Sequence, residues 1–124
     1  MKTILVVEDD EFNRDLLEQL LGEQYKILIA VDGAACIELA EQAHPDLILM
    51  DLSLPIIDGW EATRRIKSNE ILKSIPIIAV TAHAMQEDEE KARRVGCDDY
   101  ISKPVDEDLL FLKLRQFLEE PSAK

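Results

Sequence analysis

The sequence has few of the residues that interrupt regular structure or cross-link a chain. It holds four glycines, five prolines and two cysteines among 124 residues, which leaves no room for a long linker or a low-complexity arm. The glycines are isolated from one another, and this excludes a glycine-rich phosphate loop of the GxGxxG or Walker A type. Two cysteines make neither a disulfide framework nor a zinc site, so we expect Cys36 and Cys97 to be small buried thiols.

Long hydrophobic runs and an excess of positive charge are also missing. No apolar run approaches the length of a membrane span, and the N-terminus lacks the apolar core of a signal peptide. Lysine and arginine number 14 against 26 aspartates and glutamates, which gives a net charge of −12. A chain this acidic repels phosphate backbones and anionic lipids. We therefore expect a soluble, cytoplasmic protein that binds neither nucleic acid nor membranes.

Five short apolar runs recur along the chain and predict β-strands. Residues 47–50 and 77–80 read Leu-Ile-Leu-Met and Ile-Ile-Ala-Val. Because they do not alternate between apolar and polar residues, they indicate strands covered on both faces, as in a parallel sheet. The predicted strands are Thr3–Val7, Tyr25–Ala30, Asp46–Met50, Ile75–Val80 and Tyr100–Ser102.

Segments with helical spacing lie between these strands. The first carries five large apolar residues on one face and ends at Gly22, which suits a C′ position. Those five residues are Phe12, Leu16, Leu17, Leu20 and Leu21. The other predicted helices follow a cap at Asp32, cover Trp60–Lys67 and Ala84–Val95 with an end at Gly96, and begin after Asp106. Five alternations of strand and helix predict one doubly wound α/β domain over residues 1–124, with a five-stranded parallel sheet.

The fourth predicted helix differs from the others because it is polar nearly all round. Residues 86–91 read Gln-Glu-Asp-Glu-Glu-Lys, and the anchors available to it are Met85, Ala92 and Val95. A helix that buries so little is held weakly. It is either an ordinary solvated helix or a surface that can move.

Several reactive side chains directly follow the predicted strands, where open α/β sheets form their binding sites. They are Glu8, Asp9, Asp10, Asp51, Thr81 and Lys103. Two like charges about 4 Å apart repel by roughly 4 kcal/mol at an effective dielectric near 20. Convergence of Glu8, Asp9 and Asp51 without compensation would therefore be costly. A hard divalent cation is the natural counterion, and Mg²⁺ suits an open site of carboxylates and water. The sequence has no calcium-binding loop, and His44 and His83 have no partner at metal-ligand spacing.

Asp51 and Lys103 have complementary chemistry. Asp51 follows a strand predicted to be buried, and its carboxylate can act as a nucleophile. Lys103 precedes Pro104, which biases the lysine towards an extended backbone and permits a cis peptide bond. Together with the hydroxyl of Thr81, these groups are the parts needed for phosphoryl transfer, which depends on positioning and charge neutralisation. Taken alone, Asp51 also fits a strand-end acid that caps the next turn.

These motifs resemble the response-regulator receiver domain of the CheY-like superfamily. The matching segments are Val6–Asp10, Asp46–Pro55, Asp58-Gly59, Val80–Ala82 and Tyr100–Pro104. They occur in the family's order and at its intervals over about residues 2 to 119, which leaves residues 120–124 as a short tail. The resemblance implies a flavodoxin-like (βα)5 fold with strand order 2-1-3-4-5.

The resemblance also implies how the site works. Asp51 would accept a phosphoryl group from a phosphohistidine, and Lys103 and Thr81 would bind the phosphoryl oxygens. Mg²⁺, or Mn²⁺ in its place, would be held by Asp9, Asp51, the backbone carbonyl of Ser53 and, through water, Glu8. The family often has aspartate where this chain has Glu8, so this position is a variant that bears on the metal geometry. Pro104 would follow a cis bond, and Asp10 would cap a helix outside the metal shell.

The resemblance further implies a switch. Phosphorylation adds charge and acceptor oxygens at Asp51. Thr81 would be drawn towards them, and Tyr100 would turn into the vacated space and reshape the face made by the fourth helix, fifth strand and fifth helix. Ser53 and His83 would tune the rate of dephosphorylation.

The expected partners are proteins. A histidine kinase or histidine phosphotransfer protein would dock on the first helix near Asn13, Arg14 and Leu17. A downstream partner would bind the face made by the fourth helix, fifth strand and fifth helix. The chain would be a monomer or a weak homodimer. It is similar to single-domain regulators of the DivK type and to receivers of hybrid kinases. Its start at Met1 and its end just past the last helix favour the stand-alone type.

Two other functions stay open. A haloacid-dehalogenase-type phosphatase uses a similar aspartate, hydroxyl, lysine and Mg²⁺, but it requires a second aspartate where Ser53 stands and a cap for which this chain has no room. A phosphorylation-independent docking module usually lacks the acid pair, the acceptor or the lysine, and all of these are present. A receiver is not a conventional enzyme, because it catalyses only its own phosphorylation and dephosphorylation.

Overall fold

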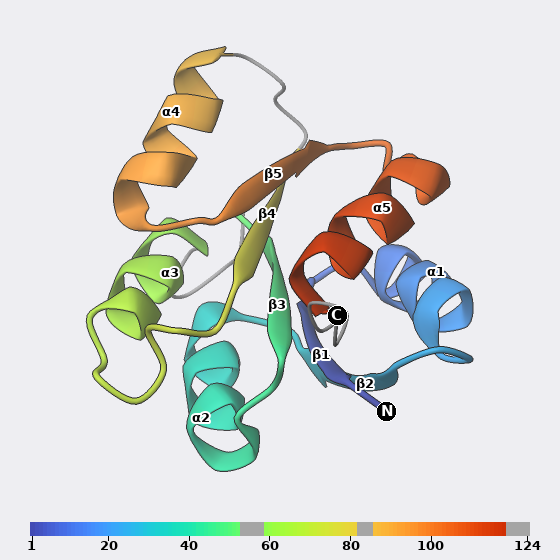
Figure 1. Ribbon diagram of the computed structural model, residues 1–124, viewed down its shortest axis with the longest axis horizontal. Helices are drawn as coiled ribbons and strands as arrows, with labels where there is room; N and C mark the ends of the chain where they lie inside the picture. Colours follow the sequence, from blue (N-terminus) through green and yellow to red (C-terminus); the bar gives the residue numbers. More distant parts are fainter. Residues whose placement is uncertain (53–58, 82–85, 119–124) are drawn as a thin grey trace, which may run out of the picture.

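The computed structural model describes residues 1–52, 59–81 and 86–118, with residues 86–88 by their backbone alone, and it places five parallel strands in one sheet (Figure 1). The strands are β1 (Thr3–Val7), β2 (Lys26–Ala30), β3 (Leu47–Asp51), β4 (Ile77–Thr81) and β5 (Asp99–Ser102). The helices are α1 (Glu11–Leu21), α2 (Gly33–Ala43), α3 (Gly59–Lys67), α4 (Gln86–Val95) and α5 (Glu107–Leu118). The strand order β2-β1-β3-β4-β5 confirms the predicted doubly wound, flavodoxin-like (βα)5 fold.

The centre of the sheet is buried on both faces. Every residue of β3 and β4 is buried, as are the last four residues of β1. The edge strands β2 and β5 are less buried. The continuous apolar runs in the sequence therefore belong to strands that are covered on both sides, as predicted.

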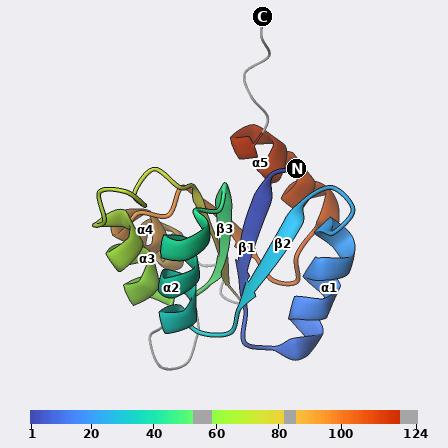
Figure 2. The ribbon, with the colours of Figure 1, turned by 90° about the horizontal axis from the view of Figure 1, so that it is seen from below.

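Two helical layers cover the sheet. Helices α1 and α5 lie on one face, and α2, α3 and α4 lie on the other (Figure 2). Alternate residues of β1 point into the two cores: Ile4 and Val6 pack with the leucines of α1 and α5, and Leu5 and Val7 pack with residues of α2 and α3. This arrangement leaves the carboxyl ends of the strands as a rim between the layers.

Helix α1 buries only part of its predicted apolar face. Leu17 and Leu21 are buried, but Phe12 is 72% exposed and Leu16 is 43% exposed. These two residues line a cavity between α1 and residues 103–105 instead of packing into the core. The predicted apolar face of α1 therefore extends beyond the core at Phe12 and Leu16, because the first half of α1 lies beside the rim of the sheet.

The predicted helix ends are mostly confirmed. The side chain of Asp32 accepts a hydrogen bond from the backbone N–H of Ala35 (2.8 Å) and caps α2, and Asp106 accepts one from Leu109 (3.0 Å) at the start of α5. Gly96, with φ at +112°, ends α4 in a conformation that favours glycine. Gly22 differs from the prediction, because its φ of −65° is helical and not left-handed.

Helix α4 buries few of its described side chains, as predicted. Among residues 89–95 only Ala92 is buried. Val95 is partly buried against the core, and the predicted anchor Met85 lies outside the described residues, as does the predicted helix start at Ala84. The helix packs against α3 and β5.

Both cysteines are buried, as predicted. Burial raises the pKa of the Cys36 thiol to about 12 and that of the Cys97 thiol to about 11, so neither thiol is a reactive nucleophile at neutral pH. None of the described helices is long and apolar enough to cross a lipid bilayer.

Candidate functional site

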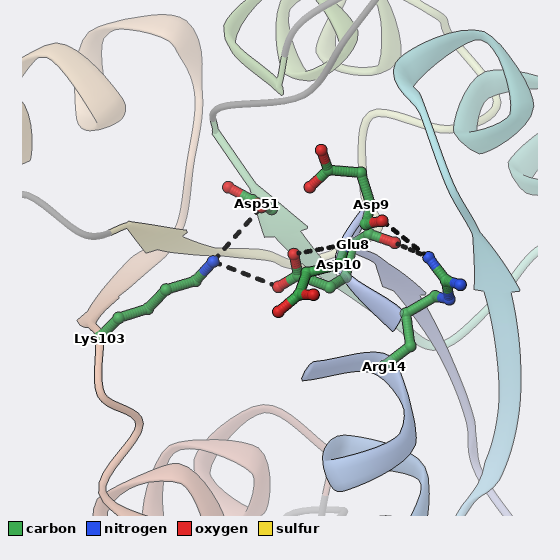
Figure 3. A network of polar contacts seen from close by, with 6 residues as sticks. All are labelled: Glu8, Asp9, Asp10, Arg14, Asp51 and Lys103. Atoms are coloured by element: carbon green, nitrogen blue, oxygen red, sulfur yellow. Dashed lines mark hydrogen bonds and ion pairs between the residues drawn. The ribbon is translucent and has the colours of Figure 1, made fainter. Parts of the chain in front are cut away.

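The structure brings most of the predicted rim residues together. Glu8 and Asp9 follow β1, Asp51 is the last residue of β3, and Thr81 is the last residue of β4. The strand register sets these ends side by side: Val7 pairs with Met50, and Asp51 pairs with Val80. Figure 3 shows the carboxylates of Glu8 and Asp51 facing Lys103, which comes from the segment after β5.

Lys103 is fixed at both its backbone and its side chain. Its N–H donates to the carbonyl of Thr81 (2.7 Å), and the bond to Pro104 is cis. Its Nζ lies 3.3 Å from Oε1 of Glu8 and 3.4 Å from Oδ2 of Asp51. One ammonium group is therefore shared by two carboxylates.

The two carboxylates that face Lys103 are buried. Glu8 is 3% exposed and Asp51 is 4% exposed. Oε2 of Glu8 also accepts a hydrogen bond from the backbone N–H of Asp10 (3.3 Å). Asp9, by contrast, is exposed, so the site is closed on one side and open to water on the other.

The charges at the site do not balance. Burial, a hydrogen bond with Asp51 and repulsion from its carboxylate raise the pKa of Glu8 from 4.5 to about 7. Burial by itself lowers the pKa of Lys103, but the attraction of Asp51 and Glu8 outweighs this and the pKa is raised. In the absence of a cation, one lysine does not neutralise the buried acids, and Glu8 takes up a proton readily.

The donor set fits a hard divalent cation. Glu8, Asp9 and Asp51 each offer a carboxylate oxygen, and these oxygens lie within 4.8 Å of one another. All three ligands are oxygens and Asp9 opens the site to water, which is the environment that Mg²⁺ prefers. A divalent cation here would relieve the repulsion that raises the pKa of Glu8. The backbone carbonyl of Ser53, the fourth ligand in our interpretation, lies outside the described residues.

Two residues that the sequence did not predict to be part of the site support its backbone. Nη1 of Arg14 donates to the carbonyls of Glu8 (3.3 Å) and Asp9 (2.9 Å), which ties α1 to the segment that carries the acids (Figure 3). Gly59 begins α3 so close to β3 that a Cβ there would lie 2.3 Å from the carbonyl oxygen of Asp51. Arg14 gave no sequence signal for this contact, whereas Gly59 belongs to the Asp58-Gly59 pair that helped to define the resemblance.

The remaining predicted residues have mixed outcomes. Thr81 is buried at the end of β4, and Tyr100, on β5, is partly buried and pairs with Ala79. Asp10 occupies the N-cap position of α1, but its side chain makes no capping hydrogen bond, so that part of the prediction is wrong. His83 lies outside the described residues, and His44 ends α2 with a left-handed backbone, at φ 47°.

Comparison with known families agrees with this geometry. A model of the response regulator receiver domain matches residues 4–115. The chain therefore belongs to the response-regulator receiver family, a family of two-component signalling domains and not of conventional enzymes.

Individual relatives are similar over most of their length. The polar-differentiation response regulator DivK of Brucella ovis is 46% identical over 105 residues, which cover 84% of this chain and 85% of that protein. The receiver domain of a sensor histidine kinase from Pseudomonas aeruginosa, solved with a magnesium ion coordinated in its active site cleft, is 38% identical with a TM-score of 0.87, and the match covers 94% of this chain and 96% of that one. A structure of the Saccharomyces cerevisiae phosphotransfer protein Ypd1 with the receiver domain of Ssk1 matches at 30% identity and a TM-score of 0.88, over 94% and 88% of the two chains.

Proposed function

We propose that this protein accepts a phosphoryl group on Asp51 from a phosphohistidine and passes the signal to a protein partner. The observation that carries the proposal is the shared ammonium of Lys103, 3.4 Å from Asp51 and 3.3 Å from Glu8, beside three carboxylates that can hold a cation. An ordinary strand-end aspartate that caps the next turn needs neither a lysine partner nor an acidic pair. The proposal covers residues 1–124 as one receiver domain.

In the transfer step, the phosphorus–nitrogen bond of the phosphohistidine breaks and a phosphorus–oxygen bond to Asp51 forms. The electron pair of the broken bond stays with the imidazole nitrogen. Lys103 is placed to stabilise negative charge on the phosphoryl oxygens, with the hydroxyl of Thr81 as a second contact. Mg²⁺ or Mn²⁺, held by Asp9, Asp51, the Ser53 carbonyl and through water by Glu8, would supply charge neutralisation.

The response to phosphorylation is proposed to follow the path from Thr81 to Tyr100. Thr81 lies on β4 and Tyr100 on the adjacent strand β5, and the backbone N–H of Lys103 donates a hydrogen bond to the carbonyl of Thr81. A shift of the Thr81 hydroxyl towards the phosphoryl group would open space for the Tyr100 ring and change the face formed by α4, β5 and α5. The weak attachment of α4 supports its role as the element that responds. Rate tuning by Ser53 and His83 is part of the same proposal.

The donor is proposed to dock on α1. A mostly apolar cavity of about 220 Å³ lies between α1 and residues 103–105, and it is lined by Phe12, Asn13 and Leu17 among others. Large exposed apolar side chains next to the reactive rim suit a protein that delivers a phosphohistidine to Asp51. The Ypd1 structure, in which a phosphotransfer protein accompanies a receiver domain, supports this class of partner. A monomer or weak homodimer and a cytoplasmic location stay predictions.

Two alternatives make different predictions. A docking module that does not depend on phosphorylation would keep its partners when Asp51 is replaced by asparagine. A phosphatase of the haloacid-dehalogenase type would turn over phosphate esters repeatedly. The paired acids and the lysine favour the receiver over both.

The test is the intact mass of the protein after incubation with acetyl phosphate and Mg²⁺. We expect a single phosphoryl adduct on the wild type, and none on Asp51→Asn or in the presence of EDTA. Short time points guard against rapid hydrolysis. A wild-type protein that forms no adduct at any time point would contradict the proposal and leave the docking module as the better account.

A further inference from the structure

A groove between α3 and α4 concentrates positive charge on an otherwise acidic protein. It encloses about 520 Å³ and is lined by Arg64, Lys67, Ser68, Lys91, Arg94 and Val95. Four of these six residues are cationic and none is acidic, in a chain whose net charge is −12. The groove is not part of the aspartate site, which lies at the carboxyl ends of the strands. Lys67 in the groove donates a hydrogen bond to Asp98, and Asp98 accepts another from the N–H of Ile77 at the amino end of β4.

One of the four cations is committed to the fold. Nζ of Lys67 donates to the carboxylate of Asp98 (2.8 Å) and to the carbonyls of Ile75 (2.8 Å) and Lys73 (3.1 Å). These three contacts use the three donors of an ammonium group. Lys67 therefore forms a fixed wall of the groove.

The other three cations line the groove and make fewer contacts than Lys67 among the described residues. Arg64 contacts Glu61 through Nη1 (2.5 Å), and Arg94 contacts Glu90 through Nη2 at the longer distance of 3.8 Å. A guanidinium carries five N–H donors, so one such contact does not occupy it. Nζ of Lys91 lies 4.5 Å from the centre of the Trp60 ring, and this cation–π contact holds the ammonium near α3.

Helix dipoles account for only part of this arrangement. Basic residues near helix carboxyl ends are favourable, and both α3 and α4 have them. Arg65 and Arg93 satisfy that preference equally well but do not line the groove. The dipole thus explains why each helix end is basic, and not why Arg64, Lys91 and Arg94 line the same groove.

We propose that the groove between α3 and α4 binds a small anion that carries several phosphate groups. Guanidinium groups match phosphate oxygens in a bidentate geometry, and the volume is in the range of small-molecule sites. The net charge of −12 repels a long polyanion such as nucleic acid, which favours a compact ligand. The proposal is independent of the phosphorylation of Asp51.

The experiment is a titration with inorganic tripolyphosphate in EDTA at constant ionic strength. Trp60 is the single tryptophan of the chain, and its emission reports on displacement of Lys91. Calorimetry gives a second readout that does not depend on Trp60. We expect saturable binding to the wild type, at least tenfold weaker binding to R64A/R94A, and binding within twofold of wild type for the matched control R65A/R93A.

An absence of saturable binding to the wild type would overturn the proposal outright, and three other results would also overturn it. The first is equal weakening in both double variants, because the anion would then interact only with diffuse surface charge. The second is a polyglutamate peptide that binds as tightly as tripolyphosphate, because this would assign the groove to an acidic protein segment. The third is loss of binding in Lys103→Ala, because the anion would then occupy the aspartate site, where Lys103 is the cation beside Asp51 and Glu8.

Discussion

The aspartate site and helix α4 are attached to the same sheet in opposite ways. At the site, the backbone N–H of Lys103 donates to the carbonyl of Thr81, that of Glu8 donates to the carbonyl of Ala30, and the side chains of Glu8 and Asp51 are buried. Along α4, Ala92 is the one buried residue of 89–95. The proposed reaction at Asp51 requires fixed distances between charges, whereas the proposed response requires an element that can shift at small cost. The difference between the two regions is therefore what the proposed function needs: a site with fixed geometry and a helix with few buried side chains.

The fixed geometry of the aspartate site is tested most strongly at Lys103. The Lys103→Ala variant lacks the ammonium group that we propose stabilises charge on the phosphoryl oxygens, so phosphorylation by acetyl phosphate should slow by about 100-fold or more. The rate is measured by intact mass against time. Lys113→Ala is the control, because it removes another partly buried lysine, one paired with Asp99 at 2.9 Å, and should leave the rate within twofold. A rate for Lys103→Ala within threefold of wild type would contradict the account.

The close approach of α3 to the site is tested at Gly59. A Cβ at this position would lie 2.3 Å from the carbonyl oxygen of Asp51 and 2.5 Å from Cα of Leu52, so α3 must shift to admit it. We expect Gly59→Ala to lower the free energy of unfolding by about 2–3 kcal/mol, as other overpacked variants do. Urea denaturation with EDTA present measures the change. An unchanged midpoint would show that α3 is held less rigidly than the structure indicates.

The charge imbalance at the site predicts a dependence of stability on pH. The pKa of Glu8 is raised from 4.5 to about 7, so the folded state binds the extra proton more tightly than the unfolded state. The contribution of Glu8 is fully present below about pH 4.5 and is lost as the pH rises through about 7. The loss is on the order of 3 kcal/mol.

Glu8→Gln separates this effect from other titrations. The free energy of unfolding, measured in EDTA from pH 5 to pH 8, should fall more steeply for wild type than for the variant. Added Mg²⁺ should restore much of the wild-type stability at pH 8, because a cation compensates the ionised acid. Parallel pH profiles for the two proteins would show that Glu8 is not the group that titrates.

The smallest expected effect tests the weak attachment of α4. Ala62 in α3 and Ala92 in α4 are both fully buried, and replacing either by glycine costs roughly 1 kcal/mol of helix stability. If α4 opens on its own, Ala92→Gly should speed hydrogen exchange of the α4 amides about fivefold. Ala62→Gly should leave that exchange unchanged while lowering global stability. Equal acceleration of α4 exchange by both variants would mean that α4 opens only with the whole domain.

Much of the site could be predicted from the sequence because it depends on strand ends. The positions of Glu8, Asp51, Thr81 and Lys103 follow from the ends of buried runs, and a parallel sheet brings such ends to one rim. The order of the strands came from the resemblance to a known family, because periodicity carries no information about which strands are neighbours.

The rest depends on packing between elements, which a local pattern does not contain. Helical spacing shows that Phe12 and Leu16 share a face with Leu17, but not that this face extends beyond the core. The contact of Arg14 with two carbonyls and the approach of Gly59 to β3 depend on how helices settle against the sheet. No periodicity records either of them.

The most direct test of the central claim locates the phosphoryl group. Borohydride reduces an aspartyl phosphate to homoserine, which peptide mass spectrometry can place in the sequence. After treatment with a phosphodonor and Mg²⁺, we expect homoserine at position 51 alone, and none when Mg²⁺ is omitted. Homoserine at position 9 or 10, or a stable phosphate on Thr81, would contradict it.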